Sequence, residues 1–480
     1  MSTIYDKYQI IMGLETHVRV KSNTKMFCPC ANAIELALEP NQNVCPICMG
    51  FPGMLPTLSA WVVDLAVRAA HAMRSTVQEK SIFDRKSYFY PDLPMGYQIT
   101  QMYHPITIGW EVRTLIHGEL KSFRIHHMHL ENDAGKLIHV SWKTLCDYNR
   151  AGSPLMEIVT EPDFRSKEDV IGYLEELQKI MRWCWASDAD MEKWQLRCDV
   201  NISVRLKDET ILRTRVELKN INSFSSIGRA IDNEFERQIE LYEAGKAPDQ
   251  ETRGWNDEKG YSTPLRSKED AMDYRYFPEP DLLPLMLSHE YIQERTINEL
   301  PIDRRIKYIE QYNLGADDAR ILSNDRTTSD FYETLVELTG DSKKSCSYIT
   351  TILFSLFDAS IEPISIVDIQ SNVTEFARVI QLVNSDELSS TNSKRVIEEL
   401  VKNGGKTDEI VDTLWLRQKN DITALEKIVD EVLANNASQV EEYRAGKVNL
   451  FGFFVGQCMK VSAGQWNPKV FTDLVKQKIG

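Results

Sequence analysis

The feature that most constrains the fold is an alternation of apolar and polar residues that recurs along the N-terminal half of the chain. In the segment GLETHVRV, Glu15 and His17 fall on one side of an extended chain, and the apolar residues fall on the other. Helical patterns do not separate every pair of such segments, so the sequence predicts an α+β fold with an antiparallel sheet rather than a parallel βαβ fold. The other alternating segments lie at 123–133, 155–160, 197–205 and 214–220.

The polar faces of these predicted strands carry acidic side chains and imidazoles. Glu15 and His17 share one strand, Glu131 ends a second, and Glu157 lies on a third. If the faces coincide, the four side chains converge, and closely packed carboxylates repel one another unless a cation lies among them. A site rich in oxygen ligands favours Mg²⁺ or Mn²⁺ over zinc and suits the binding of phosphates. The alternative is an ordinary solvated face of an antiparallel sheet.

Further polar residues follow the same alternation. Asp199 and Glu217 are predicted to share the polar face of two neighbouring strands. His127 and His129 lie on the same side of their strand as Glu131. We interpret these two histidines as polar-face residues rather than as metal ligands.

Four cysteines form two pairs, Cys28 and Cys30 in a CPC sequence and Cys45 and Cys48 in a CPIC sequence. Thiolates at such spacings suit a tetrahedral structural Zn²⁺ site with no open position. Four unligated buried thiols are the alternative, and the first pair is one residue tighter than the common CxxC spacing. A zinc site of this kind would be structural and says little about chemistry.

The segment FDRKSYFYPDLPMGYQITQ, at 83–101, is dense in aromatic residues, proline, aspartate and glycine. We interpret it as a shaped loop between strands. Its interleaved basic and aromatic residues include Lys86 and Tyr88, which suit the stacking of a base or the binding of a terminal adenosine. An aromatic corner that fills a core is the alternative.

The length of 480 residues predicts two or three domains. From about Glu294 the pattern becomes charged and helical, and Gly404 and Gly405 form a break. The GGKT sequence at this break is not a phosphate-binding loop, because it lacks the upstream glycine and follows no predicted strand. We predict a strand-rich domain with the cysteine pairs at 1–293, a helical domain at 294–405 and a small helical tail at 406–480.

The net charge of −15 argues against a protein that coats duplex nucleic acid, although a local basic surface or a partner protein still permits RNA binding. No apolar run reaches the roughly eighteen residues that a membrane helix needs. The polar N-terminal sequence lacks the apolar region of a signal peptide. We therefore expect no membrane partner and a location in the cytoplasm, or in an organellar stroma or matrix.

Long stretches of the chain resemble, in order, those of the GatB/GatE family, the B subunits of tRNA-dependent amidotransferases. The absence of a large insertion before the helical region favours the B type over the archaeal E type. A tail stretch, VEEYRAGKVNLFGFFVGQCMK, is similar to the YqeY-like region of the family. The other matching stretches are GLETHV, CPC and CPIC, FDRKSYFYPDLPMGYQITQ, HLENDAGKLIH, DYNRAGSPLMEIVTEPD, LRCDVNISVR, ELKNINSF and DYRYFPEPDLLP.

The resemblance implies a catalytic cradle similar in fold to glutamine synthetase, followed by an all-helical domain and the YqeY-like tail. It implies that the cradle uses ATP and Mg²⁺ to phosphorylate the side-chain carboxylate of mischarged Glu-tRNA(Gln), Asp-tRNA(Asn) or both. Ammonia from the amidase A subunit would then displace the phosphate. A small C subunit would tie A to B, and the helical parts would hold the tRNA.

The resemblance also carries individual residues. It implies metal ligands at the four residues that the strand pattern groups, Glu15, His17, Glu131 and Glu157. Ordinary ion pairing is the alternative for Lys86 and Arg150. Residues implied near the nucleotide, the aminoacyl end or a second ion are Lys86, Tyr88, Arg150, Asp199 and Glu217.

The sequence departs from the family pattern at two positions near these residues. Met95 stands where relatives commonly have lysine, so a basic contact there is not expected. Asn132 replaces a frequent glutamate beside Glu131 and cannot supply a second charge. All four cysteines are kept, which supports bound zinc.

Three hypotheses follow, and the first is favoured. An ATP-dependent, amide-forming enzyme subunit needs the four convergent acidic and imidazole residues. A tRNA-binding scaffold whose catalysis lies in its partners has no reason to place them together. A free-standing amino-acid ligase would not need the helical tail.

Overall fold

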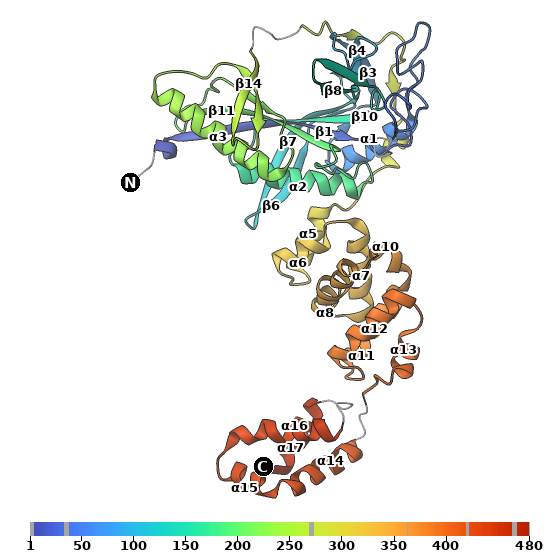
Figure 1. Cartoon of the computed structure of the whole chain (residues 1–480), viewed down its shortest axis with the longest axis vertical. Coiled ribbons are helices and arrows are strands. Elements are labelled where there is room, and N and C mark those ends of the chain that lie inside the picture. Colours follow the sequence, from blue (N-terminus) through green and yellow to red (C-terminus); the bar gives the residue numbers. More distant parts are fainter. Residues whose placement is uncertain are drawn as a thin grey trace. The chain divides into compact units, whose positions relative to one another are not determined.

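The computed structural model describes residues 4–32, 38–267, 273–361, 363–418, 422–462 and 468–479. The chain divides into two compact units, Met1–Arg304 and Arg305–Gly480. The first unit contains the described strands, and the second is built from helices (Figure 1). Within the described ranges, no helix combines the length and apolar character required to cross a membrane.

A ten-stranded sheet forms the centre of the first unit. Its strand order is β14-β13-β12-β11-β1-β10-β7-β5-β2, and β6 also pairs with β7. The strands are β1 (Tyr8–Arg19), β2 (Thr76–Val77), β5 (Thr107–Ile108), β6 (Glu111–Ile116), β7 (Glu119–Asn132), β10 (Pro154–Thr160), β11 (Leu196–Leu206), β12 (Val216–Lys219), β13 (Glu251–Asn256) and β14 (Tyr261–Ser267).

The predicted antiparallel pairing is wrong at one position in this sheet, where β12 and β13 run parallel. The helix α3 (Phe224–Glu243) connects these two strands, and a crossover helix returns the chain in the same direction. The other named pairs of the sheet are antiparallel. The first unit is therefore a mixed α and β structure with a large mixed sheet.

The apolar face of the central strand β1 is fully buried, as its alternation predicts. Leu14, Thr16 and Val18 are at most 1% exposed. The helix α2 (Lys167–Trp183) packs on α3 and β6, and α3 packs on β11 and β14. Ser166 begins α2 as predicted, since its Oγ accepts a hydrogen bond from the backbone N–H of Asp169 at 3.1 Å.

The remaining strands form two small sheets. In one, β3 (Lys80–Ser87) pairs with β4 (Tyr97–His104) and with the short strands β15 (Phe277–Pro278) and β16 (Leu285–Met286). The prediction of a loop at 83–101 is wrong for most of its length, because both ends of this segment pair with each other. Only 88–96, where Pro91, Pro94 and Gly96 cluster, lies outside the strands. The second small sheet is the hairpin of β8 (Lys136–Val140) and β9 (Lys143–Asp147).

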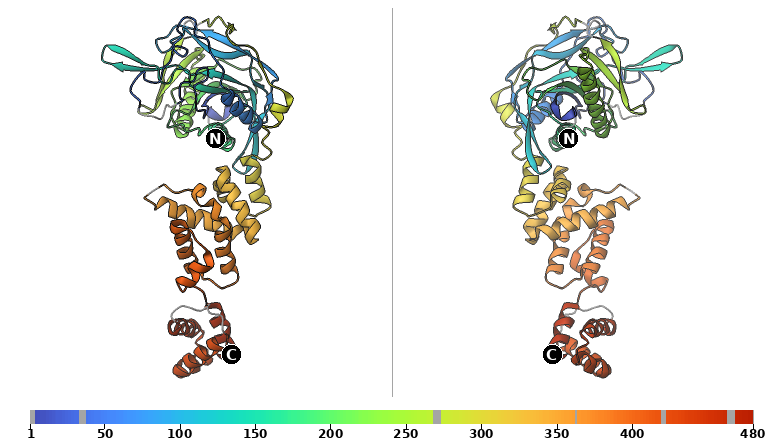
Figure 2. Two further views of the ribbon diagram at one scale, coloured as in Figure 1. Left: turned by 90° about the vertical axis from the view of Figure 1, so that its right-hand side faces the viewer. Right: turned by 90° about the vertical axis from the view of Figure 1, so that its left-hand side faces the viewer.

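Helices cover the rest of both units. In the first unit, α1 (Ala60–Ala72) follows the cysteine pairs and α4 (His289–Gln293) lies near its end, while α5 (Pro301–Glu310) contains the boundary between the two units. The helices of the second unit, shown from two sides in Figure 2, are α6 (Ala316–Leu322), α7 (Arg326–Thr339), α8 (Ser342–Ser347), a π-helix (Tyr348–Leu353), α9 (Phe354–Asp358), α10 (Ile366–Ile369), α11 (Val373–Asn384), α12 (Ser390–Asn403), α13 (Thr407–Thr413), α14 (Ile422–Asn435), α15 (Ala437–Arg444), α16 (Phe451–Val461) and α17 (Pro468–Ile479).

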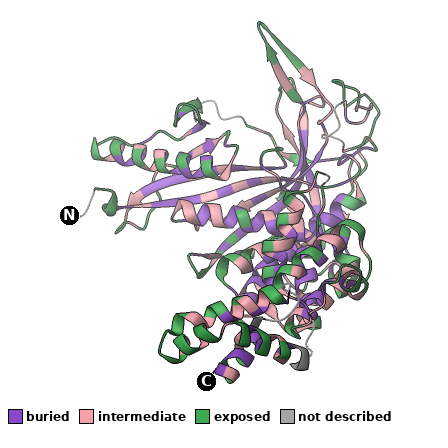
Figure 3. Cartoon of the chain, turned by 60° about the horizontal axis from the view of Figure 1, so that its bottom comes forward, coloured by how far each residue is buried: buried purple, intermediate pink, exposed green. Residues whose placement is uncertain are grey.

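Among the residues that the structure describes, the second unit has two apolar cores. One gathers buried residues from Tyr308 to Leu416 and the other from Leu425 to Ile479. Gly404 ends α12 with a positive φ of 65°, which matches the break that the sequence predicts. Helix faces alternate between buried and exposed residues, as Figure 3 shows, which is the expected pattern for amphipathic segments.

Candidate active site

Strand register brings the predicted acidic and imidazole residues onto one face of the large sheet. His17 on β1 lies opposite Glu157 on β10, and Glu15 lies opposite Asp199 on β11. Residues directly opposite each other in antiparallel strands have neighbouring side chains. The polar faces of these strands therefore coincide, as the sequence analysis required.

The first group in this face consists of His17, Glu131 and Glu157. The Nε2 of His17 lies 3.3 Å from Glu157 and 3.5 Å from Glu131. One ligand atom from each residue lies within 4.8 Å of the others. This arrangement suits a divalent cation with mixed oxygen and nitrogen ligands.

His129 belongs to the same cluster, although the sequence analysis interpreted it as an ordinary polar-face residue. It lies opposite Glu157 in the register of β7 and β10. Its Nε2 is 3.2 Å from Glu157 and 3.7 Å from Glu131, and the residue is only 8% exposed. His129 lies two residues from Glu131, which predicts that the two side chains share one face of β7. This spacing does not reveal which residue of the neighbouring strand lies opposite His129.

Burial and charge act against each other in this cluster. Burial alone would lower the pKa of His129, but Glu157 and Glu131 raise it to about 9. The pKa of His17 is raised by the same two carboxylates against the effect of burial. Burial would raise the pKa of Glu157, but the two imidazoles hold it well below its usual range. The two histidines therefore act as counter-charges for the carboxylates.

The second group consists of Glu15, Asp199 and Glu217, whose oxygens also lie within 4.8 Å of one another. The predicted set of four is thus divided, with Glu15 among the second group rather than the first. Lys219 bonds to Asp199 and lies 3.0 Å from Glu217. Burial, Glu157 and Glu217 raise the pKa of Glu15, so a cation bound here would offset the repulsion that this carboxylate experiences.

Hydrogen bonds hold the carboxylates of the second group in place. Asn201 donates to Glu15 at 3.0 Å, and Thr252 donates to Glu217 at 2.7 Å. The strand alternation that predicts the polar face also places Asn201 and Lys219 on it, beside Asp199 and Glu217. Thr252 was missed, because it lies 35 residues from Glu217 in the chain and no local pattern links the two.

Lys86 and Tyr88 lie on β3 and just beyond it, close to the first group. Burial would lower the pKa of Lys86, but Glu131 is the largest influence raising it above its ordinary value. The Nζ of Lys86 lies 5.0 Å from the ring centre of Tyr274. Burial raises the pKa of Tyr88 to about 12. Lys86 is therefore a fixed cation beside the acidic cluster.

Arg150 makes different contacts from Lys86. Its guanidinium donates to the carbonyl oxygens of Ala134 and Gly135 at 3.0 and 2.6 Å and lies 3.5 Å from Asp133. These contacts stabilise the turn that follows Glu131. Gly135 leaves little room for a side chain in this turn, because an added Cβ would lie about 3.0 Å from the carbonyl oxygen of Asp147. In this structure, Arg150 therefore has ordinary ion-pairing and turn-stabilising contacts. Ion pairing is the alternative to a contact with phosphate or the aminoacyl end.

The four cysteine sulfurs also lie within 4.8 Å of one another. The backbone N–H of Cys45 donates to the Sγ of Cys48 at 3.2 Å. The Nζ of Lys25, a fully buried lysine, lies 3.8 Å from the same sulfur. Four sulfurs with a nearby cation and an N–H donor fit a Zn²⁺ ion, because a tetrathiolate site carries excess negative charge.

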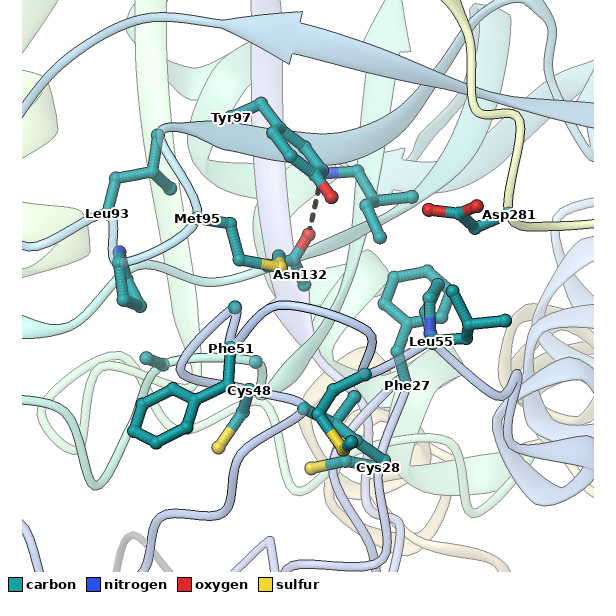
Figure 4. A pocket seen from close by; sticks show the side chains of 18 of the residues that line it. Phe27, Cys28, Cys48, Phe51, Leu55, Leu93, Met95, Tyr97, Asn132 and Asp281 are labelled. Carbon is teal, nitrogen blue, oxygen red and sulfur yellow. Dashed lines mark hydrogen bonds between the residues drawn. The ribbon is translucent and has the colours of Figure 1, made fainter.

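A cavity of about 200 Å³ lies beside the cysteine cluster (Figure 4). Cys28 and Cys48 line one side of it, and Met95 and Tyr97 line another. Met95 fills the space in front of Gly50, where an added Cβ would lie 2.8 Å from the Met95 side chain. Met95 therefore contributes an apolar side chain to the lining of this cavity.

Comparison with known protein families shows to which class of protein this chain belongs. The GatB/GatE catalytic domain matches residues 10–293, and a GatB domain matches residues 330–479. The chain belongs to the GatB family, and its near full-length relatives are B subunits of amidotransferases that act on aminoacyl-tRNA.

Three relatives are named as the B subunit of an aspartyl/glutamyl-tRNA(Asn/Gln) amidotransferase. The protein of Persephonella marina is 42% identical over 98% of this chain and 99% of its own length. That of Caldicellulosiruptor saccharolyticus is 40% identical over 98% and 99%. That of Lachnoclostridium phytofermentans is 40% identical over 98% of both chains.

Proposed function

We propose that this chain is the B subunit of a tRNA-dependent amidotransferase and that its first unit carries an ATP- and Mg²⁺-dependent ligase step. The substrate is the side-chain carboxylate of mischarged Glu-tRNA(Gln), Asp-tRNA(Asn) or both. The observation that carries the proposal is the convergence of acidic and imidazole side chains from β1, β7, β10, β11 and β12 on one sheet face.

The reaction needs an activation step because a carboxylate would have to expel oxide. Transfer of the γ-phosphoryl group of ATP to a carboxylate oxygen gives an acyl phosphate and ADP. Ammonia then forms the C–N bond as the bond from carbon to the phosphate oxygen breaks, and phosphate and one proton leave. No protein nucleophile is required, so positioning and charge neutralisation are the main contributions of the chain.

The residues of the site have distinct roles in this proposal. His17, Glu131 and Glu157 would hold one Mg²⁺ or Mn²⁺ ion, and a second could bind at the group that contains Glu15. When bound, the ions supply positive charge to the phosphates. Lys86 contributes a further positive charge, because Glu131 keeps it protonated.

Two partner subunits and the remaining parts of this chain complete the proposed assembly. An amidase A subunit would supply ammonia, and a small C subunit would join A to B. We assign the first unit to a glutamine synthetase-like cradle, which its large sheet supports, and the structural zinc to the four cysteines. We place the cradle at 1–293, a tRNA-binding helical domain at 294–405 and a YqeY-like tail at 406–480, in a cytoplasmic or organellar complex.

The decisive experiment uses Glu131→Gln in the assembled complex, with glutamine hydrolysis and tRNA amidation assayed separately. The substitution removes one charge but keeps the shape. We expect glutaminase activity to persist and amidation to collapse, together with the ADP formation that depends on mischarged tRNA. Unimpaired amidation would leave a tRNA-binding scaffold as the function of this chain.

Substrate choice is tested with the unmodified complex. Glu-tRNA(Gln) and Asp-tRNA(Asn) are supplied in turn, with free glutamate as a third substrate. Product from either tRNA and none from free glutamate supports the proposal. Amidation of free glutamate without tRNA would instead support a free-standing amino-acid ligase.

A further inference from the structure

Four tyrosine rings form a continuous row beside the candidate active site. Tyr88 lies 5.9 Å from Tyr274, Tyr274 lies 5.9 Å from Tyr276, and Tyr276 lies 6.5 Å from Tyr103, measured between ring centres. The rings meet at angles of 65° to 76°. We call these four residues the tyrosine row. They come from three segments, at the end of β3, at the end of β4 and just before β15.

The tyrosine row leads from the surface to the acidic cluster. Tyr103 at its outer end is 59% exposed, whereas Tyr274, Tyr276 and Tyr88 are half-buried. Burial raises the pKa of Tyr276 above its usual value, and Glu157 and Glu131 also contribute to this rise. The inner rings are therefore electrostatically coupled to the candidate active site, while the outer ring is accessible from solvent.

Positive charges accompany the tyrosine row. Lys86 lies over the ring of Tyr274 at the inner end. Arg275, which lies between Tyr274 and Tyr276 in the sequence, is exposed. Its φ of 43° is one that non-glycine residues seldom adopt. Such backbone strain persists where surrounding structure maintains it, often at a binding site. Local cations beside aromatic rings are notable in a chain with a net charge of −15.

We propose that the tyrosine row binds the unpaired 3′-terminal nucleotides of the mischarged tRNA and delivers their aminoacyl group to Lys86 and the carboxylates. Single-stranded nucleic acids bind proteins through stacking of bases on aromatic side chains and through cations that follow the backbone. A row of four rings is longer than a single base requires. It therefore suits a short strand better than the adenine of ATP. This inference rests on the proposed amidotransferase function.

The test compares variants of the assembled complex at the accessible end of the row. Tyr103→Ala removes the outer ring, and Tyr103→Phe keeps it without the hydroxyl group. Tyr276→Ala removes the next ring. Tyr261→Ala is the matched control, because Tyr261 is an exposed tyrosine on β14 at the far edge of the large sheet. Thermal unfolding of each complex verifies that the variants fold.

Two measurements follow for each variant. The first is the KM for mischarged tRNA and, separately, the KM for ATP. The second is the affinity for an RNA minihelix of the acceptor stem, made with and without its unpaired 3′ end. The glutaminase rate of the same samples reports whether the complex remains assembled.

We expect Tyr103→Ala and Tyr276→Ala to raise the KM for tRNA roughly tenfold, within the range that loss of one stacking ring produces. The KM for ATP should not change, and Tyr103→Phe should behave like the unmodified protein. The affinity difference between variants should vanish with the minihelix that lacks its 3′ end.

Several outcomes would overturn the inference. An unchanged KM for tRNA in both alanine variants would show that the row does not bind RNA. A raised KM for ATP alone would assign the row to the nucleotide, and loss of partner proteins from the complex would assign it to a protein interface. Each of these outcomes can occur while Glu131→Gln still abolishes amidation. The inference can therefore be wrong while the proposed function remains correct.

Discussion

The acidic cluster and the cysteine cluster are both candidate metal sites, but they are built differently. The four cysteines lie between residues 28 and 48 of one stretch, whereas the acidic residues extend from Glu15 to Glu217. The cysteine cluster thus depends on local turns, and the acidic cluster depends on the pairing of five strands. Two candidate metal sites in one chain can therefore make very different demands on the fold.

The two clusters also differ in how their negative charge is balanced. In the acidic cluster, His17 and His129 contact the carboxylates directly, and Lys219 does so in the second group. In the cysteine cluster, the buried cation Lys25 contacts one sulfur and also donates to the carbonyl oxygen of Asn43 at 2.7 Å. The first arrangement suits exchange of ions and substrate, and the second suits permanent binding of one ion.

The largest expected effect is a loss of amidation activity, and it should follow substitution in the acidic cluster rather than in the cysteine cluster. Glu157→Gln in the assembled complex should lower the amidation rate about 10²- to 10³-fold, because it removes a charge that acts on the reacting phosphate. Glutaminase activity should be retained. Parallel assays of ammonia release and amidated tRNA check this, with Glu209→Gln as the control at a half-buried ion pair with Arg213, outside the acidic cluster. Equal loss of both activities would indicate a structural rather than a catalytic defect.

The pH dependence of stability is the second test of the acidic cluster. The pKa of His129 is raised to about 9, so its stabilising contribution is complete below its unfolded value of about 6.5 and is lost as the pH rises through 9. In metal-free protein, the free energy of unfolding should fall by on the order of 3 kcal/mol across this range. Denaturant unfolding with EDTA, from pH 6 to 9.5, measures it.

The variant His129→Gln supplies the control for this pH dependence. It should show a flatter profile between pH 6.5 and 9 than the unmodified protein. Glu157, whose pKa is depressed, contributes in the opposite window, since its stabilisation is lost as the pH falls below about 4.5. An identical slope in protein and variant would contradict the assignment of the charge to His129.

A smaller effect is expected at the cysteine cluster, and it should alter stability more than activity. Cys28→Ser should lower the zinc content below one ion per chain and the Tm by about 5 °C, which corresponds to about 2 kcal/mol. Lys25→Met should keep the zinc but release it faster to a chelating dye. Elemental analysis and dye kinetics provide the readouts. Unchanged zinc release would remove the role assigned to Lys25.

The smallest effect is expected at the cavity beside the cysteines. Met95→Lys introduces the residue that the family resemblance leads one to expect at this position, and the flexible lysine side chain can extend toward solvent. The Tm should change by about 2 °C or less, and zinc content and amidation should stay within twofold. A large fall in amidation alone would show that this cavity communicates with the acidic cluster.

Several features were predictable from local sequence. The alternation around Glu15 predicted both the buried face of β1 and the polar face, and Ser166 predicted the start of α2. The spacing of the cysteines predicted their grouping. Each of these depends on residues within a few positions of one another, where backbone geometry alone sets the distances.

Other features were wrong or missed because they depend on pairing across the chain. The strands β3 and β4 were interpreted as a loop, since turn residues at their centre dominated the segment. His129 was correctly placed on the polar face, but its contact with Glu157 was missed, because that contact exists only through the register of β7 and β10. The buried Lys25 gave no signal, since a lysine is ordinarily solvent-exposed.

Residue types and their alternation along the chain are enough to predict which side chains could hold a metal ion, which faces of the strands are apolar, and which family the chain resembles. The tertiary structure decided how these residues are grouped: His17 lies with Glu131 and Glu157, and Glu15 lies with Asp199 and Glu217. The physical reason is that side-chain alternation fixes the face of a strand, whereas only hydrogen-bonded register between strands fixes which residues on that face become neighbours.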